Sequence, residues 1–305
     1  MQNQLKPKPP EWTILKILEW TTSYFKSHVI DSPRSTAEIL LAHILHVERI
    51  DLYLQFDKPL DKAELFFFKS LIKRRRNREP VAYITGHKEF WSIDFSITKH
   101  SLIPRPETEC LVETALALMP EDLPGPARVL ELGTGSGAII IALASEKPKN
   151  IFFASDNSID AVMLAGKNAV QHGFGPAINF FSGDWFAPLK NDFLKFDIII
   201  SNPPYIKSAV IPSLEPEIWK YEPINALDGG KDGLSALRHI VISAHNYLKE
   251  KGSLLLEIGH DQKDALGAII EECGAYDNIV FIKDYSGFYR IVSMKKTIKN
   301  INSGC

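Results

Sequence analysis

The segment Ser201–Tyr205, with the sequence SNPPY, combines residue types that could bind and align a planar amino group. Pro203 and Pro204 hold φ at about −65° and cannot donate to a strand ladder, so the apolar strand before them must end in a stiff loop. The Asn202 side-chain oxygen and the Pro203 carbonyl oxygen are two acceptors, which suit the two protons of an NH₂ group. Tyr205 adds a ring face beside these acceptors.

Such a loop would promote attack by a nitrogen that is otherwise a poor nucleophile. The lone pair of an amide nitrogen is delocalised, and holding both N–H bonds on acceptors raises the electron density there. Alignment for in-line attack can contribute about 7–11 kcal/mol, and oriented dipoles stabilise positive charge that develops on the nitrogen. The alternative interpretation is a proline-terminated strand without a catalytic role. The loop favours a planar NH₂ group but does not distinguish glutamine, adenine and guanine.

A glycine-rich turn between an apolar strand and a helix is the second candidate site. Alternating glycines let the backbone turn tightly and approach a ligand, and such turns lie where open α/β sheets bind ligands. The phosphate-loop pattern is absent, and the G-x-G-x-G spacing differs from the dinucleotide fingerprint G-x-G-x-x-G. We expect a nucleotide-type ligand here rather than a plain strand–helix turn. The residues of this turn are Gly133, Thr134, Gly135, Ser136 and Gly137.

Three side chains that follow the next two strands could complete this ligand site. Asp156 follows an apolar run, where a carboxylate could accept hydrogen bonds from two ribose hydroxyls; a helix N-cap is its alternative role. Asp184 could accept from an exocyclic amine, and Trp185 could stack on an adenine ring or pack in the core. With Glu131 and the glycines upstream, the sequence favours ligand binding for Asp156.

Composition narrows the class of protein. The chain has 305 residues, 45% of them hydrophobic and 24% charged, which is typical of a globular protein with a sizeable core. The formal net charge of −2 provides no global positive field for nucleic acid. Cys110, Cys273 and Cys305 have neither disulfide-framework nor zinc spacing. With neither a secretory signal nor a membrane-spanning apolar stretch, we expect a cytoplasmic protein without a metal site.

Patterning along the chain predicts a small helical domain followed by a larger α/β domain. Apolar stripes at helical spacing fill residues 11–80, and we expect one helix to begin with a capping box formed by Ser35 and Glu38. Alternating apolar residues after Pro80 indicate a β-hairpin. The remainder alternates strands and helices, which is typical of βαβ units in a mostly parallel sheet. The predicted parts are a helical domain 1–80, a hairpin linker 81–109, an α/β domain 110–295 and a tail 296–305.

The expected strands of the α/β domain are apolar runs bounded by turn residues. A final pair of runs around Ser286 and Gly287 reads as a terminal hairpin. The strands are expected at 128–132, 151–155, 178–181, 197–201, 253–258, 279–283 and 288–294.

A basic run, Lys73–Arg78, ends the last helix of the N-terminal domain. Cations are favoured near a helix C-terminus, so the run is typical of a solvated helix end. The alternative is a docking patch for an acidic partner surface or for RNA, which would make association depend on salt.

Further motifs resemble those of the peptide chain release factor glutamine methyltransferases of the HemK/PrmC type. These are EPVAYITG at 79–86, LIPRPETE at 102–109 and the segment from Tyr221-Glu222-Pro223 to Leu234, in addition to the NPPY motif. The resemblance runs from about residue 10 to 295 and includes the helical domain. It implies a Rossmann-like, class I S-adenosylmethionine methyltransferase domain of the α/β class, preceded by a small all-helical domain and a β-hairpin linker.

The family resemblance also implies a reaction, namely methyl transfer from S-adenosyl-L-methionine to the glutamine of the Gly-Gly-Gln loop in class I release factors. The N-terminal domain would dock the release factor, and a monomer without a membrane or a direct nucleic-acid substrate is expected. Arg105 and Glu107 would line the active site, or form a local ion pair instead. Asn202 to Tyr205 would hold the glutamine amide. The cofactor residues would be Gly133 to Gly137, Asp156, Trp185 and Asn202.

Two other functions are compatible with parts of the sequence. A nucleic-acid amino-methyltransferase would share the Asn202 chemistry, but it needs a basic groove and a means of extruding the base. A cofactor-binding scaffold for translation factors would not need the intact NPPY motif. We therefore expect an enzyme that acts on a protein amide.

Overall fold

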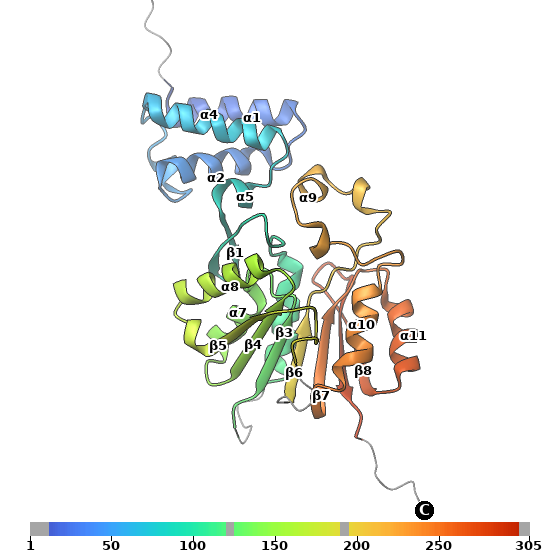
Figure 1. Ribbon diagram of the computed structural model, residues 1–305. Coiled ribbons are helices and arrows are strands. Elements are labelled where there is room, and N and C mark those ends of the chain that lie inside the picture. Colours follow the sequence, from blue (N-terminus) through green and yellow to red (C-terminus); the bar gives the residue numbers. More distant parts are fainter. Residues whose placement is uncertain (1–11, 120–124, 190–194, 299–305) are drawn as a thin grey trace, which may run out of the picture. The chain divides into compact units, whose positions relative to one another are not determined.

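The computed structural model describes residues 12–119, 125–189 and 195–298, and these form two compact units that divide after Gly86 (Figure 1). Pro7–Pro10, Cys305 and most of the tail 296–305 lie outside the described residues. The first unit contains five helices within its described part. They are α1 (Ile14–Ser27), α2 (Pro33–Leu45), α3 (Asp51–Leu54), α4 (Lys62–Arg76) and α5 (Val81–Thr85).

The first unit is a helical domain with its own apolar core. Side chains from α1, α2 and α4 form one cluster, in which Phe25, Leu40 and Phe68 are fully buried. Because helical spacing places these residues on one face of each helix, the three helices bury their stripes against one another. The helical domain expected from the sequence is therefore observed, with α5 as its last element.

The capping box expected at Ser35 and Glu38 is wrong. Helix α2 begins two residues earlier, at Pro33, whose fixed φ suits the first position of a helix. Glu38 is buried and accepts hydrogen bonds from Arg34, Arg49 and Tyr53. Its carboxylate is thus taken by Arg34 one helical turn away and by Arg49 and Tyr53, two partners that local spacing does not reveal. A capping box occurs instead at the start of α4, between Asp61 and Glu64.

Part of the basic run Lys73–Arg78 stabilises the helical domain. Arg74 forms an ion pair with Glu79, with 2.8 Å between Nε and Oε2. Arg75 is buried and donates to the Glu79 carbonyl oxygen at 3.2 Å. Arg75 is therefore not part of a solvated helix end, whereas the Arg74 side chain is 41% exposed beside Glu79 and docking by this run stays a prediction.

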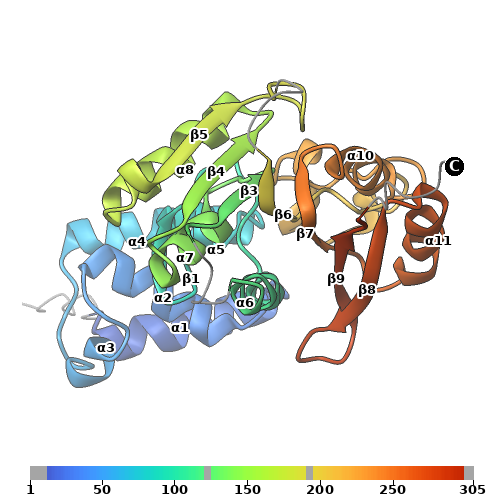
Figure 2. The same cartoon turned by 90° about the horizontal axis from the view of Figure 1, so that it is seen from below.

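The second unit is an open seven-stranded sheet with helices on both faces (Figures 1 and 2). The strand order is β5-β4-β3-β6-β7-β9-β8, and only the pairings of β9 with β7 and β8 are antiparallel. Figure 2 shows α6 and α7 on one face and α10 and α11 on the other. The strands are β3 (Arg128–Leu132), β4 (Ile151–Asp156), β5 (Ile178–Ser182), β6 (Phe196–Ser201), β7 (Leu248–Glu257), β8 (Tyr276–Lys283) and β9 (Tyr289–Lys296).

The expected strands and the terminal hairpin agree with this sheet to within a few residues. The helices of the unit connect successive strands or lie beside the sheet. They are α6 (Glu109–Ala117), α7 (Ala138–Glu146), α8 (Ile159–Gln171), α9 (Pro216–Trp219), α10 (Ser235–Ala244), α11 (Lys263–Cys273) and the short 3-10 turns η1 (Pro106–Thr108), η2 (Gly175–Ala177), η3 (Ile211–Ser213) and η4 (Ile224–Ala226).

The hairpin expected between the domains is present as β1 (His87–Phe90) and β2 (Ile93–Ser96). It belongs to the second unit, where the Ser96 amide donates to the Asn168 side chain on α8 at 3.0 Å. The predicted linker 81–109 is therefore divided, with α5 in the first unit and the hairpin in the second. Within the described ranges, no helix has the length and apolar character needed to cross a membrane.

The register of the parallel strands places the candidate site. Leu132 at the end of β3 lies opposite Ser155 of β4 and Ser201 of β6, and Ser201 lies opposite Leu256 of β7. Four strands therefore end at one edge of the sheet. The loops that follow them must meet there, since parallel strands direct their carboxyl ends to the same side.

Candidate active site

A pocket opens at this edge of the second unit and encloses about 930 Å³, including the open space at its mouth. Its walls come from the glycine turn after β3, Asp156 at the end of β4, and the segment Gly183–Trp185 after β5. Asn202 and Pro204 after β6 form a further wall. Residues from four separate strand ends thus face one cavity of the size that binds small ligands.

The glycine turn adopts a conformation that requires glycine at alternate positions. Gly133, Gly135 and Gly137 have φ of 75°, 56° and 83°, a region that side chains with a Cβ rarely adopt. The amides of Gly133 and Thr134 both donate to the Ser155 carbonyl oxygen of β4, at 2.8 and 2.9 Å. The turn is therefore held against the neighbouring strand while its other side lines the pocket.

Two carboxylates beside the turn make the pocket acidic. Asp156 lines the pocket and accepts from the Gly135 amide at 2.9 Å and from the Ser158 amide at 2.9 Å. Glu131 is buried and accepts from the Thr134 hydroxyl at 2.6 Å. Burial raises the pKa of Glu131 to about 8 and also raises the pKa of Asp156. A cation in the pocket would therefore be favoured, because it stabilises both ionised forms.

The structure separates the two roles expected for Asp156. The N-cap of α8 is Ser158, whose hydroxyl accepts from the Ala161 amide at 3.3 Å. Asp156 instead lies in the pocket wall and holds the glycine turn. Asp184 and Trp185 also line the pocket, and Trp185 packs against the core cluster of the sheet as well.

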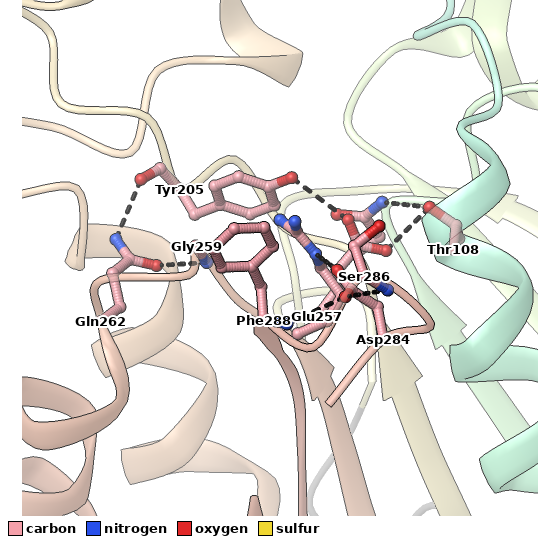
Figure 3. A network of polar contacts seen from close by, with 10 residues as sticks. Thr108, Tyr205, Glu257, Gly259, Gln262, Asp284, Ser286 and Phe288 are labelled. Carbon is pink, nitrogen blue, oxygen red and sulfur yellow. Dashed lines mark hydrogen bonds and ion pairs between the residues drawn. The ribbon is translucent and has the colours of Figure 1, made fainter. Parts of the chain in front are cut away.

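The SNPPY loop leaves the sheet between β6 and β7 and is anchored at several points. The Ser201 hydroxyl donates to the Leu132 carbonyl oxygen at 2.7 Å. The Asn202 amide nitrogen donates to the Thr108 hydroxyl at 3.2 Å. The Tyr205 hydroxyl donates to Glu257 at 3.2 Å, and the Tyr205 carbonyl oxygen accepts from Gln262 at 2.9 Å (Figure 3). The loop is thus stiffened by its prolines and by bonds to four other segments, namely β3, η1, β7 and the residue before α11.

The phenol of Tyr205 is kept neutral by its surroundings. Burial is the largest influence and raises its pKa well above the usual range, and the nearby Glu257 carboxyl group raises the pKa further. A neutral phenol cannot act as a base near pH 7. Tyr205 can therefore offer a ring face and a hydrogen-bond donor at the site, but it cannot remove a proton.

The structure places Arg105 and Glu107 differently. Arg105 lines the pocket and donates to Glu222, a buried carboxylate that also accepts from the Ile103 amide at 3.2 Å. Glu107 is exposed and does not line the pocket. The local ion pair between Arg105 and Glu107 that the sequence suggested is therefore wrong. The partner of Arg105 lies 117 residues further along the chain, beyond the reach of spacing arguments.

Three residues at the site had no role in the sequence analysis, namely Thr108, Glu257 and Gln262. Thr108 and Glu257 hold the side chains of the SNPPY loop, and Gln262 holds its backbone. One signal was available, since Glu257 directly follows the apolar run Leu254–Leu256, and Glu131 likewise follows Val129 and Leu130. A charge at such a position is costly unless it has partners.

A close backbone contact explains the glycine at position 229, the first of the segment Gly229–Gly233. A Cβ atom on Gly229 would lie 2.7 Å from the Gly233 carbonyl oxygen and 2.8 Å from the Tyr205 Cα. We expect Gly229→Ala to push Tyr205 away from its position and to lower kcat by about 10²-fold, the effect typical of a 1 Å misplacement. Steady-state kinetics of the variant test this.

The matched control for that variant is Gly267→Ala on α11, where an added Cβ meets nothing within 4 Å. Gly267→Ala should retain normal kcat. Normal turnover in Gly229→Ala would show that the loop tolerates the displacement and that the close contact is unimportant.

The pocket fits S-adenosylmethionine better than a dinucleotide. Glu131, Asp156 and Asp184 line it, and Arg105, the one arginine among its described lining residues, is paired with Glu222. The Asp156 carboxylate would repel a pyrophosphate, whereas a sulfonium or ammonium group would favour the ionised forms of Asp156 and Glu131. With the sheet order and the glycine turn, the site defines a class I, S-adenosylmethionine-dependent methyltransferase.

Comparisons with known proteins give the particular family. The profile of the PrmC N-terminal domain matches residues 16–86, and that of the methyltransferase small domain matches residues 110–214. The release factor glutamine methyltransferase of Geobacter sulfurreducens is 41% identical over 285 residues, covering 93% of this chain and 97% of the relative. The enzyme of the same name from Escherichia coli is 40% identical over 261 residues, covering 86% and 91%. The chain therefore belongs to the release factor glutamine methyltransferase family.

The structural comparison agrees on the fold. The hMettl16 catalytic domain matches with a TM-score of 0.55 and 14% sequence identity, covering 75% of this chain and 84% of that domain. At this identity the likeness extends to the methyltransferase fold only.

Proposed function

We propose that this chain transfers a methyl group from S-adenosylmethionine to the side-chain amide nitrogen of the glutamine in the Gly-Gly-Gln motif of release factors. The observation that carries the proposal is the anchored Asn202 amide in the wall of an acidic pocket. Its nitrogen is bound to Thr108, which leaves its oxygen as an acceptor for an incoming NH₂ group. The names of the relatives, which match over almost their full length, support glutamine as the substrate.

The residues of the chain would act mainly by binding and orientation. When bound, the cofactor supplies a methyl group that its sulfonium centre has already activated. The Asn202 side-chain oxygen and the Pro203 carbonyl oxygen would accept hydrogen bonds from the NH₂ group of the glutamine. The Tyr205 ring would pack against the plane of the glutamine amide. These dipoles would stabilise positive charge on the nitrogen as it forms. No strong base is needed, because the methylated, charged amide is itself a strong acid.

The other proposed assignments follow from the same pocket. Gly133 to Gly137 and Trp185 would contact the cofactor, and Asp156 would accept from its ribose hydroxyls. Arg105 would face the substrate side of the pocket, with Glu222 holding its guanidinium group. Glu107 is exposed and outside the pocket lining, so its assignment to the active site rests on the family motif alone.

We further propose that the helical N-terminal domain docks the release factor and that the enzyme acts as a monomer in the cytoplasm, where translation terminates. Nucleic acid is not the proposed substrate, because the net charge is −2 and acidic residues line the pocket.

A labelling experiment tests the proposed reaction. The protein is incubated with methyl-labelled cofactor and either a purified release factor, the same factor with its Gly-Gly-Gln glutamine changed to alanine, DNA or RNA. We expect label on the intact release factor alone. Label on the alanine variant would refute glutamine as the acceptor, and label on DNA or RNA alone would favour an amino-methyltransferase of nucleic acid.

A further inference from the structure

Four polar side chains, two of them in the SNPPY loop, are joined by a continuous series of three hydrogen bonds. The Asn202 amide nitrogen donates to the Thr108 hydroxyl at 3.2 Å, and the Thr108 hydroxyl donates to Glu257 Oε2 at 2.7 Å. The other oxygen of Glu257 accepts from the Tyr205 hydroxyl at 3.2 Å. Figure 3 shows Thr108 and Tyr205 approaching Glu257 from opposite sides. Both Thr108 and Glu257 are buried, which limits competition from water for the bond between them.

While Glu257 is ionised, the donors and acceptors along this series of hydrogen bonds can be assigned in only one way. A carboxylate has no proton to donate, so the single proton of the Thr108 hydroxyl must point to Glu257. The Thr108 oxygen can then only accept a hydrogen bond from Asn202. The donor must be the Asn202 side-chain nitrogen, because the side-chain oxygen carries no proton. The Asn202 oxygen is consequently turned away from Thr108.

We propose that Glu257 and Thr108 are positioning residues that orient the Asn202 amide, so that its oxygen faces the amino group to be methylated. An amide rotated by half a turn would present its NH₂ group instead, which repels the N–H bonds of a substrate. The proposal rests on the proposed role of Asn202 as the acceptor for that group. It explains why a buried carboxylate lies at this place, although burial without partners would be costly.

The position of Glu257 follows from the sheet. It is the last residue of β7, which pairs in parallel with β6, the strand that leads into the SNPPY loop. Thr108 comes from η1, just before α6, and reaches the same edge. A positive charge also acts on the site, since Arg290 of β9 lowers the pKa of Glu257 and is itself held by Asp284 at 3.2 Å.

Single variants test the orientation. Thr108→Val removes the hydroxyl at nearly constant volume, and Glu257→Gln replaces the carboxylate by a group that can also donate. Each should lower kcat by about 10²-fold, the size expected when a reacting group is misplaced. Thr108→Ser restores the hydroxyl and should recover most of the activity. Thr114→Val on α6 is the matched control, because its hydroxyl donates to the Cys110 carbonyl oxygen of the same helix and does not line the pocket, and it should have normal kcat.

A double-mutant cycle separates positioning from a general loss of structure. If Thr108 acts through Asn202, then Thr108→Val should cost nothing further in the Asn202→Ala background. A role in folding alone would lower activity again in the double variant. Normal kcat in both Thr108→Val and Glu257→Gln would also overturn the proposal. So would a loss of kcat in Tyr205→Phe equal to that of Glu257→Gln, together with normal kcat in Thr108→Val.

The pH dependence gives an independent measurement. Burial raises the pKa of Glu257 to about 7, against the opposing effects of Thr108, Arg290 and Tyr205, while the negative Glu107 raises the pKa further. When Glu257 is protonated, its carboxyl group can itself donate a hydrogen bond to Thr108. The Thr108 hydroxyl is then no longer forced to donate to Glu257, and the orientation of the Asn202 amide is no longer fixed. We expect kcat of the natural enzyme to rise with pH through about 7, and Glu257→Gln to lack this rise. The same rise in Glu257→Gln would contradict the proposal.

The proposed substrate and the proposed orientation can fail separately. Without labelling of release-factor glutamine by the natural enzyme, the proposed function is wrong. The variants are then assayed with the substrate whose planar amino group the natural enzyme does methylate. With normal labelling but no effect of Thr108 or Glu257, only the orientation is wrong.

Discussion

Asn202→Ala is expected to lower kcat for the methylation of release-factor glutamine by about 10²- to 10³-fold, the range measured when one preorganised dipole is removed from an active site. The Asn202 oxygen would hold one N–H bond of the amide, and alanine leaves that bond without an acceptor. The neighbouring Pro203 carbonyl cannot compensate, because the prolines hold the backbone in place. Single-turnover labelling with saturating cofactor measures the rate of the chemical step directly.

The control for this variant is Asn246→Ala. Asn246 is exposed between α10 and β7, and its side chain does not line the pocket. Normal turnover in that control and a large loss in Asn202→Ala would support the role of the loop. Near-normal kcat in Asn202→Ala would mean that the loop does not bind the reacting nitrogen.

The second large effect is expected from Asp156→Ala, which should raise the Kd for S-adenosylmethionine by about 10²-fold or more. The carboxylate would accept hydrogen bonds from two ribose hydroxyls, and each hydrogen bond to a charged group contributes about 1.5–3 kcal/mol. Asp156 also holds the Gly135 amide, so its loss would loosen the glycine turn. Titration calorimetry with the cofactor alone measures the affinity.

Two further variants make this test specific. Asp156→Asn keeps one oxygen acceptor and should have an intermediate affinity. Asp264→Ala removes an exposed carboxylate from the first turn of α11 and should bind the cofactor normally. Unchanged affinity in Asp156→Ala would place the ribose elsewhere in the pocket.

Some parts of the fold and site could be predicted because they depend on residues close together in the chain. The strand 128–132 has the bounds of β3, since five consecutive mostly apolar residues before a glycine leave few alternatives. The three positive φ angles of the glycine turn follow from the G-x-G-x-G spacing. The end of β6 at Ser201 follows from the two prolines.

Other expectations failed where a distant partner replaced a local one. Glu38 was expected to cap its own helix, but Arg49 and Tyr53 take its carboxylate. Arg105 was expected beside Glu107, but it binds Glu222. In each case a buried charge requires the best available partners, and burial is a property of the folded chain.

The sequence by itself determined that Ser201–Tyr205 forms a stiff, acceptor-bearing loop at the end of a buried strand, because two prolines and an asparagine allow little else. Only the tertiary structure decided in which direction the Asn202 amide points. That direction depends on Thr108 and on Glu257, two residues that lie 149 positions apart and are hydrogen-bonded to each other. The physical reason is that spacing specifies backbone geometry, whereas the orientation of a side-chain amide is decided by the donors and acceptors that the sheet brings around it.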